Sequence, residues 1–199
     1  MSYENDSVRM KTARFIMDRE ARRDREGRLK VYKLPFADGG GTFEVAGIND
    51  RYHMTVAHRL RDLISRGAHP TAEREAVEFI AEYTDIVTRW VKLTAAEAFL
   101  RDCCFNRGPK GALRILQLAV GVADDGKFGP LTRAAIKERS QQPDQLLDAL
   151  RSARERYEHR VAPPVGARAK FWAGLVNRWN KAEDFARQFT GGKKTELTE

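Results

Sequence analysis

The first 50 residues combine a helical pattern with an extended one. The i, i+3, i+4, i+7 spacing that defines one helix face is occupied by Ala13, Ile16, Met17 and Glu20. Period-two alternation follows at residues 28–31 and returns at residues 42–45, on the other side of the glycine run 39–41. These patterns predict a helix over residues 12–23, followed by a β-hairpin with a glycine-rich tip.

Helical periodicity dominates the rest of the chain. It predicts helices over residues 55–64, 71–90, 94–106, 109–121, 130–136, 144–161 and 167–188. Thr94 and Glu97 have the spacing of a capping box, and Pro109 follows a break at Gly108. The expected fold is mainly helical with one small hairpin, and residues 189–199 are expected to form a disordered tail.

Charge restricts the class of partner. The 199 residues include 36 basic and 28 acidic ones, a net charge of +8, which favours a polyanion such as nucleic acid, an anionic membrane or a bacterial envelope. The arginines are interspersed, as in Arg22-Arg23, and do not form the stripes with interleaved aromatics that nucleic-acid-binding modules show. We therefore expect no nucleic-acid partner.

Hydropathy and cysteine usage exclude further classes. No run approaches the roughly 20 apolar residues of a membrane span, and residues 1–10 lack the apolar core of a signal peptide. Cys103 and Cys104 are adjacent within an apolar run, which excludes a disulfide framework and favours two small core residues. Cysteine and histidine are too sparse for the usual zinc sites, so no metal or other cofactor is expected.

Glu20 is the first candidate for chemistry. A carboxyl group on an otherwise apolar helix face loses solvent, which disfavours its charged form and suits a general acid at neutral pH. The alternative is that the helix ends near Glu20, whose carboxylate pairs with Arg19 or Arg23. Glycoside hydrolysis usually needs a second carboxylate. The acids near enough in sequence are Asp24, Asp38, Glu44 and Asp50.

A second candidate lies between two helices of the C-terminal half. Gln117 precedes the run from Asp125 to Thr132, a loop in which Gly126 and Gly129 are expected to leave polar groups open to a ligand. The acids do not alternate as an EF-hand requires. A plain turn at residues 124–126 is the alternative.

These motifs resemble glycoside hydrolase family 108, the N-acetylmuramidases that include phage endolysins and secretion activator proteins. The resemblance covers residues 11–182 and rests on the order of helix, Glu20, Gly-Gly-x-Thr tip, Gly47-Ile48 and helices. The second half is similar to the accompanying predicted peptidoglycan-binding domain. Its matching segments are Phe105-Asn106-Arg107-Gly108-Pro109, Leu116-Gln117, residues 125–132 and residues 171–178.

The resemblance implies a lysozyme-like muramidase region over residues 11–95 and a peptidoglycan-binding region over residues 96–188. The family's catalytic glutamate falls on Glu20, although Ala21-Arg22-Arg23 stands where the family has Gly-Gly-Tyr. The substrate-binding residues that it implies are Asp38, Gly39, Gly40, Thr42, Asn106, Gln117, Asp125 and Thr132. The tip from Asp38 to Thr42 would border the sugar cleft.

The expected activity is hydrolysis of the β-1,4 bond between N-acetylmuramic acid and N-acetylglucosamine, with Glu20 protonating the leaving oxygen. One alternative is a peptidoglycan-binding protein without catalysis, and another is a basic nucleic-acid or scaffold protein. Without a cleavable signal, the protein would be made in the bacterial cytoplasm. It would act in the periplasm or cell wall after lysis or after delivery by a holin or secretion machinery.

Overall fold

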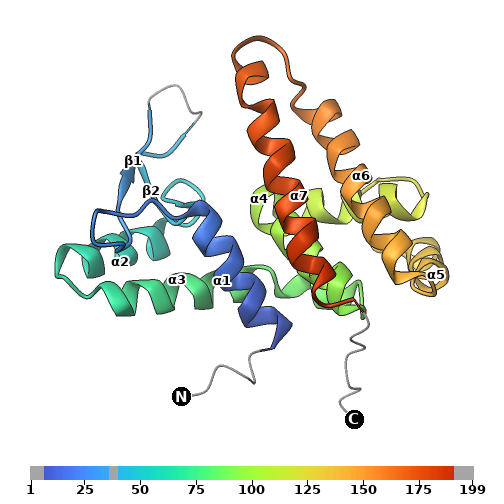
Figure 1. Ribbon diagram of the computed structural model, residues 1–199, viewed down its shortest axis with the longest axis horizontal. Helices are drawn as coiled ribbons and strands as arrows, with labels where there is room; N and C mark the ends of the chain where they lie inside the picture. Colours follow the sequence, from blue (N-terminus) through green and yellow to red (C-terminus); the bar gives the residue numbers. More distant parts are fainter. Residues whose placement is uncertain (1–6, 36–39, 191–199) are drawn as a thin grey trace. The chain divides into compact units, whose positions relative to one another are not determined.

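The computed structural model describes residues 7–35 and 40–190, and the chain divides into two compact units, Met1–Tyr83 and Thr84–Glu199. Both units are built mainly of helices, and the first adds a small antiparallel sheet (Figure 1). The mainly helical fold predicted from the sequence is confirmed, and it is consistent with a lysozyme-like architecture. No helix within the described ranges is long and apolar enough to cross a membrane.

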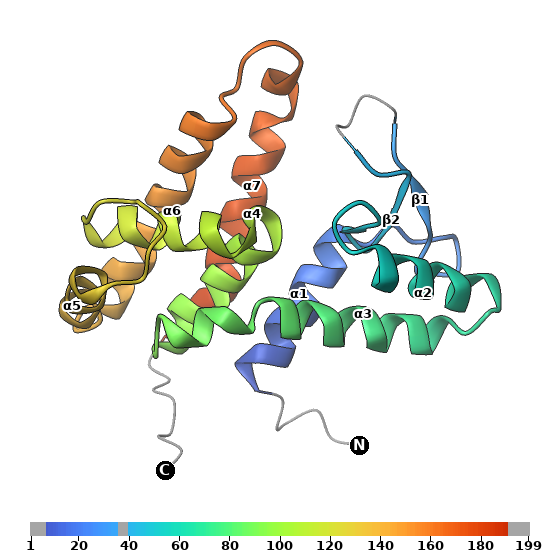
Figure 2. The ribbon, with the colours of Figure 1, turned by 180° about the vertical axis from the view of Figure 1, so that it is seen from behind.

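The first unit packs three helices and the sheet around one core. Its elements are α1 (Val8–Glu20), β1 (Tyr32–Lys33), β2 (Phe43–Val45), β3 (Ile48–Asn49), α2 (Met54–Ser65) and α3 (His69–Tyr83). Within this unit α3 contacts both α1 and α2, and α2 also contacts β2 and β3 (Figure 2). The buried side of α1 is formed by Thr12, Ala13, Ile16 and Met17. This is the apolar face that the spacing predicted.

The sheet contains one strand more than the predicted hairpin. Its order is β1-β2-β3, all antiparallel, with Glu44 paired to Tyr32 on one side and to Asn49 on the other. Ala46 and Gly47 join β2 to β3 with φ values of +50° and +74°. Two consecutive residues with positive φ form the tight turn that matches strand twist. The chain therefore reverses immediately after Val45.

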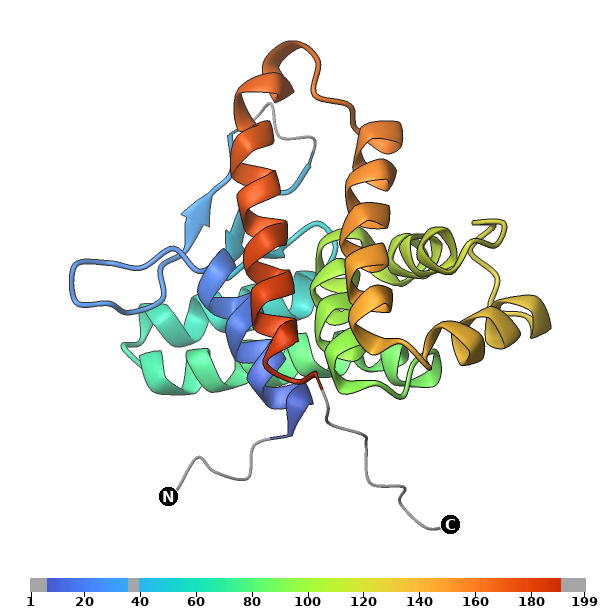
Figure 3. The ribbon, with the colours of Figure 1, turned by 45° about the vertical axis from the view of Figure 1, so that its right-hand side comes forward.

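The second unit surrounds one long helix. Its elements are η2 (Asp85–Arg89), α4 (Thr94–Val120), α5 (Pro130–Arg139), α6 (Pro143–Val161), η3 (Gly166–Phe171) and α7 (Trp172–Arg187). α4 packs against α6 and α7, which run side by side (Figure 3). The largest buried side chains at this junction include Phe99, Leu116, Leu146 and Trp179. Cys103 and Cys104 are buried in the same unit, as predicted.

α4 bends where the sequence predicted that one helix ends and another begins. Gly108 has φ +69° and ψ 169°, a conformation that glycine adopts without steric cost, and Pro109 follows it. Gly111, one turn later, lies close to α6, and a Cβ there would meet the Tyr157 hydroxyl at 3.3 Å. The bend therefore brings the second half of α4 against α6.

The capping box predicted at Thr94 is wrong. The Thr94 hydroxyl donates to the carbonyl of Phe189 at 2.8 Å, and the N-cap residue is Leu93, which makes no side-chain cap bond. Glu97 instead accepts from Arg101 Nε at 3.0 Å. The Thr94 side chain thus makes a tertiary contact, and the Glu97 side chain forms a buried ion pair, so neither caps the helix.

The division between the units lies earlier than the predicted boundary after residue 95, which falls inside α4. Arg101 explains the difference, because its guanidinium donates to Thr84 Oγ1 and to Asp85 Oδ1, each at 2.8 Å. These bonds attach η2 to α4. Residues 84–93 therefore belong with the second unit.

Candidate functional site

Glu20 is the last residue of α1 and is half-buried on the same side as Met17. The backbone turns to an extended conformation at Ala21, whose N–H still donates to the Met17 carbonyl at 2.7 Å. The helix thus ends at Glu20, as the alternative interpretation of the sequence required.

Both neighbouring arginines have partners other than Glu20. Arg23 pairs with Asp18 at 3.0 Å, pairs with Glu73 and donates to the Gly27 carbonyl at 2.7 Å. The guanidinium of Arg19 lies 5.2 Å from the centre of the Phe15 ring. Arg23 thus joins α1 to α3, since Asp18 lies on α1 and Glu73 lies on α3.

The segment after Glu20 connects it to the sheet. The carbonyl of Arg22 accepts from Lys30 N–H at 2.8 Å, and Arg23 forms a bridge with Leu29. The Arg22 guanidinium lies 5.0 Å from the centre of the Tyr32 ring on β1. The end of α1 is therefore fixed to the strand that leads into the glycine-rich tip.

Asp24, the nearest candidate for a second carboxylate, holds this connecting turn. Its Oδ1 accepts from the backbone N–H groups of Glu26 at 3.0 Å and Arg28 at 2.9 Å, and its Oδ2 pairs with Arg28 Nε at 2.8 Å. The bond from the Arg28 backbone and the nearby guanidinium lower the pKa of Asp24 to about 2. These bonds give Asp24 a structural role.

At the tip of the sheet, Thr42 and Asp50 are joined. Thr42 donates through its hydroxyl to Asp50 Oδ2 at 2.6 Å and through its backbone N–H to Asp50 Oδ1 at 2.8 Å. Gly40 lies on the same turn, where its carbonyl accepts from Asn49 Nδ2 at 3.2 Å. The structure thus brings two predicted binding residues, Gly40 and Thr42, together with one candidate carboxylate, Asp50.

The two remaining candidates for a second carboxylate are Glu44 and Asp38. Glu44 is half-buried in the middle of β2. Asp38 and Gly39, both predicted to bind substrate, lie outside the described residues. An open hollow of about 330 Å³ lies between α1 and α3, but neither Glu20 nor Thr42 lines it, so we do not assign it to the sugar.

In the second unit, Gln117 organises the predicted binding loop. Its Nε2 donates to Asp125 Oδ1 at 2.9 Å, to the Lys127 carbonyl at 3.0 Å and to Thr132 Oγ1 at 3.2 Å. Its Oε1 accepts from Gly126 N–H at 2.8 Å. Gln117 and Thr132 are buried, so these polar groups hold the loop in shape. Direct contact of Gln117, Asp125 or Thr132 with peptidoglycan stays a prediction.

The two glycines of this loop differ. Gly126 has φ +75°, and a Cβ there would approach the Lys110 side chain to 3.0 Å. Gly129 has φ −108°, and a Cβ there would meet nothing within 4 Å. Only Gly126 is therefore required by the loop conformation. The expectation that both glycines hold the loop open is half correct.

The surface near this loop carries an exposed leucine and basic groups. Leu131 is 81% exposed at the start of α5, and the Arg133 guanidinium lies 4.4 Å from the centre of the Phe128 ring. Asp124 pairs with Arg160, which lowers the pKa of the aspartate. Leu131, Arg133 and Arg160 are exposed and so, unlike Gln117, are accessible to a ligand.

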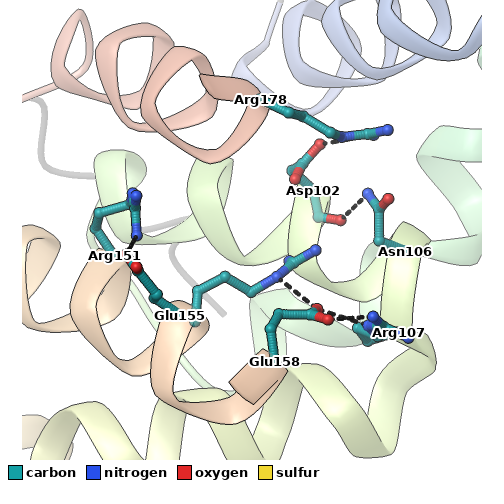
Figure 4. A network of polar contacts seen from close by, with 8 residues as sticks. Asp102, Asn106, Arg107, Arg151, Glu155, Glu158 and Arg178 are labelled. Carbon is teal, nitrogen blue, oxygen red and sulfur yellow. Dashed lines mark hydrogen bonds and ion pairs between the residues drawn. The ribbon is translucent and has the colours of Figure 1, made fainter. Parts of the chain in front are cut away.

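Asn106 lies in a different part of the second unit, within a polar network (Figure 4). Its amide donates to the carbonyl of Asp102, one turn earlier in α4, at 2.8 Å. The Asp102 carboxylate faces Arg178 of α7 at 3.4 Å. The structure does not place Asn106 among the hydrogen-bonded residues of the Gln117 loop. Its role as a substrate ligand stays a prediction.

The same network contains a buried acid that the sequence analysis did not identify. Glu158 is 1% exposed and accepts from Arg107 Nε at 2.6 Å and from Arg154 Nε at 3.2 Å (Figure 4). A buried carboxylate needs such partners to offset its lost hydration. Its i, i+4 spacing from Arg154 was the available signal, but that spacing is typical of exposed helices as well.

The buried cysteines belong to this core. Burial raises the pKa of the Cys103 thiol to about 11 and that of Cys104 to about 12. Among the described residues, no group of three or more histidine, cysteine, aspartate or glutamate side chains could hold a metal ion.

Comparison with known proteins identifies a matching family and a similar solved structure. Residues 111–180 match the Predicted Peptidoglycan domain family. The structure of SagA from Brucella abortus is similar, with a TM-score of 0.63 and 19% sequence identity over 93% of this chain and 97% of that chain. No curated protein matches this sequence. The family match supports a protein related to peptidoglycan, and the structural match supports the fold.

Proposed function

We propose that this protein binds peptidoglycan through its second unit and cleaves the glycan strand through its first. The observation that carries the proposal is the match of residues 111–180 to the Predicted Peptidoglycan domain. The loop held by Gln117 and most of α6 and α7 fall inside this range. Peptidoglycan is the partner that this match supports, and the excess of basic residues suits an anionic envelope.

The proposed reaction is hydrolysis of the β-1,4 bond between N-acetylmuramic acid and N-acetylglucosamine, with Glu20 as the general acid. Its half-buried position at the end of α1, fixed to the sheet through residues 21–30, supports this role. Glu20 would donate its proton to the glycosidic oxygen as the bond to the sugar breaks, and water would complete the hydrolysis. The tip around Gly40 and Thr42 would border the sugar, and a holin or secretion machinery would deliver the protein to the wall.

Glu20→Gln tests this role on purified cell walls. The amide keeps the size of the side chain but carries no acidic proton, so wall clearing should fall at least about a hundredfold. Glu82→Gln is the matched control, since Glu82 is exposed on α3. Both variants should melt near the wild-type temperature. A Glu20→Gln variant that retains a third of the activity removes Glu20 from the mechanism.

The second candidate function is binding without catalysis. It is favoured by the sequence after Glu20. Ala21-Arg22-Arg23 stands where glycoside hydrolase family 108, which this chain resembles, has Gly-Gly-Tyr. The same assay separates the two functions. Wild-type protein that sediments with cell walls but releases no soluble sugar would be a binding protein.

A further inference from the structure

The carboxylate of Asp50 accepts hydrogen bonds from Thr42 and Phe43, at the start of β2. Its Oδ1 accepts from the backbone N–H groups of Thr42 at 2.8 Å and Phe43 at 3.3 Å, and its Oδ2 accepts the Thr42 hydroxyl proton at 2.6 Å. The Asp50 N–H returns a bond to the Phe43 carbonyl at 3.1 Å. The Thr42 bonds lower the pKa of Asp50, so the carboxylate is charged at neutral pH.

The backbone at Gly41 lies so close to the Asp50 carboxylate that a side chain at position 41 would collide with it. Gly41 has φ +90°, and a Cβ there would lie 2.6 Å from Asp50 Oδ1 and 2.3 Å from Asn49 Oδ1. Neither the backbone angle nor the space allows a side chain. The glycine at position 41 therefore permits the approach of Asp50 to Thr42.

The consequence for Thr42 follows from its single hydroxyl proton. A threonine hydroxyl has one proton to donate and two lone pairs. Since Asp50 holds the proton, Thr42 Oγ1 can act toward any other group only as an acceptor. Thr42 is exposed, so this acceptor is available at the tip of the sheet.

We propose that Asp50 is a positioning residue of the sugar site, which orients the Thr42 hydroxyl so that its oxygen accepts a hydrogen bond from an O–H donor. The donor is the attacking water or a sugar hydroxyl. This inference rests on the proposed function, in which the tip borders the sugar. We assign the contact with the donor to Thr42, whose side chain is exposed, while the two Asp50 oxygens accept three hydrogen bonds from Thr42 and Phe43.

Asp50→Asn tests the direction of this bond with little change in shape. The asparagine oxygen can still accept the two backbone N–H groups, but its Nδ2 would donate to Thr42 Oγ1. The threonine proton would then point away from residue 50, and the site would lose its oriented acceptor. We expect hydrolysis to fall about 10- to 100-fold. The melting temperature should also fall modestly, because the lowered pKa of Asp50 means that its charge stabilises the fold, so activity is compared well below that temperature.

Two variants of Thr42 complete the test. Thr42→Val removes the hydroxyl at nearly constant volume and should lose as much activity as Asp50→Asn. Thr42→Ser keeps the hydroxyl and should retain activity within about threefold of wild type. The double variant Asp50→Asn/Thr42→Val should be no slower than Thr42→Val alone, because Asp50 would have nothing left to orient.

The kinetic constants of Asp50→Asn and Thr42→Val identify the group that donates to Thr42 Oγ1. A loss confined to kcat assigns it to the attacking water, and a rise in KM assigns it to a sugar hydroxyl that is bound before the reaction. Full activity of Asp50→Asn, additive losses in the double variant, or equal losses for Thr42→Ser and Thr42→Val would each overturn the inference.

Glu20→Gln, assayed beside these variants, separates this inference from the proposed function. If the wild type cleaves no glycan, both fail. If the wild type is active, Glu20→Gln is inactive and Asp50→Asn is fully active, only the role of Asp50 fails.

Discussion

At the scale of single residues, acids that look alike in the sequence have different surroundings in the structure. Asp24 and Asp50 are both candidates for a second carboxylate because they are near Glu20 in sequence. Asp24 holds the turn at residues 24–28, whereas Asp50 holds the Thr42 hydroxyl. Sequence distance cannot separate these roles, because each depends on which backbone N–H groups converge on the carboxylate.

The role of Asp24 predicts a pH-dependent effect on stability. Its folded pKa of about 2 lies below the value of about 3.9 expected for an unfolded chain, so the charged form stabilises the fold above pH 4. Asp24→Asn should therefore lower the melting temperature at pH 7, and the difference from wild type should shrink as the pH falls from 4 toward 2.

Thermal melts across this range check the prediction, with Asp62→Asn as the control, because Asp62 is exposed and its pair with Arg61 is long, at 3.6 Å. A difference between wild type and Asp24→Asn that stays constant down to pH 2 would show that the charge of Asp24 does not stabilise the turn.

At the scale of elements, regular helices are predictable and their ends are less so. Apolar spacing identified the buried face of α1 and most of the later helices, because burial of one face is a local pattern. The cap predicted at Thr94 failed because Thr94 bonds a carbonyl 95 residues away. A contact of that range leaves no signal in the neighbouring sequence.

The loop between α4 and α5 offers a matched pair of substitutions. Gly126→Ser introduces a side chain at positive φ and against Lys110, so it should destabilise the protein by about 1–2 kcal/mol. Gly129→Ser places a good N-cap residue in open space and should be neutral or slightly stabilising.

Melting temperature and sedimentation with cell walls measure both effects. Gly126→Ser should also weaken wall binding if the loop surface near Leu131 contacts peptidoglycan. Equal losses of stability for the two variants would contradict the assignment of the strained position to Gly126 alone.

At the scale of the whole molecule, charge is unevenly divided between the units. Residues 84–199 contain 21 of the 36 basic and 14 of the 28 acidic residues, which gives +7 of the total +8. The unit that contains the match to the Predicted Peptidoglycan domain therefore carries nearly all of the net positive charge. We expect electrostatic attraction to the wall to come mainly from this unit.

Paired charge variants of the full chain test this expectation. Lys137→Gln/Arg139→Gln removes two charges from the exposed end of α5, and Arg25→Gln/Arg66→Gln removes two exposed charges from the first unit. The first pair should weaken wall binding by about two- to fivefold per charge, a surface effect that salt screens. Binding isotherms between about 0.05 M and about 0.5 M salt measure it. Equal losses of wall binding for both pairs of variants would contradict an attraction that comes mainly from the second unit.

The sequence predicts the mainly helical class, the turn before Pro130 and the buried cysteines, because each follows from local spacing or composition. It does not predict the third strand, which depends on positive φ at Ala46, a residue that rarely adopts it. The buried contacts of Glu158 were also missed, since its partner Arg107 lies 51 residues away. For the candidate site, the sequence predicts roles for Glu20 and Thr42, and the bond from Thr42 to Asp50 is visible only in the structure.

The most direct measurement is the identity of the sugar at the new reducing end of digested peptidoglycan. Purified walls are treated with the wild type or with Glu20→Gln, the products are reduced with borohydride, and the labelled ends are identified by mass spectrometry. Cleavage of the proposed bond leaves N-acetylmuramic acid at the reducing end, so the wild type should yield reduced N-acetylmuramic acid and Glu20→Gln should yield almost none. Reduced N-acetylglucosamine, equal yields from both proteins, or no new reducing end at all would contradict a muramidase that acts through Glu20.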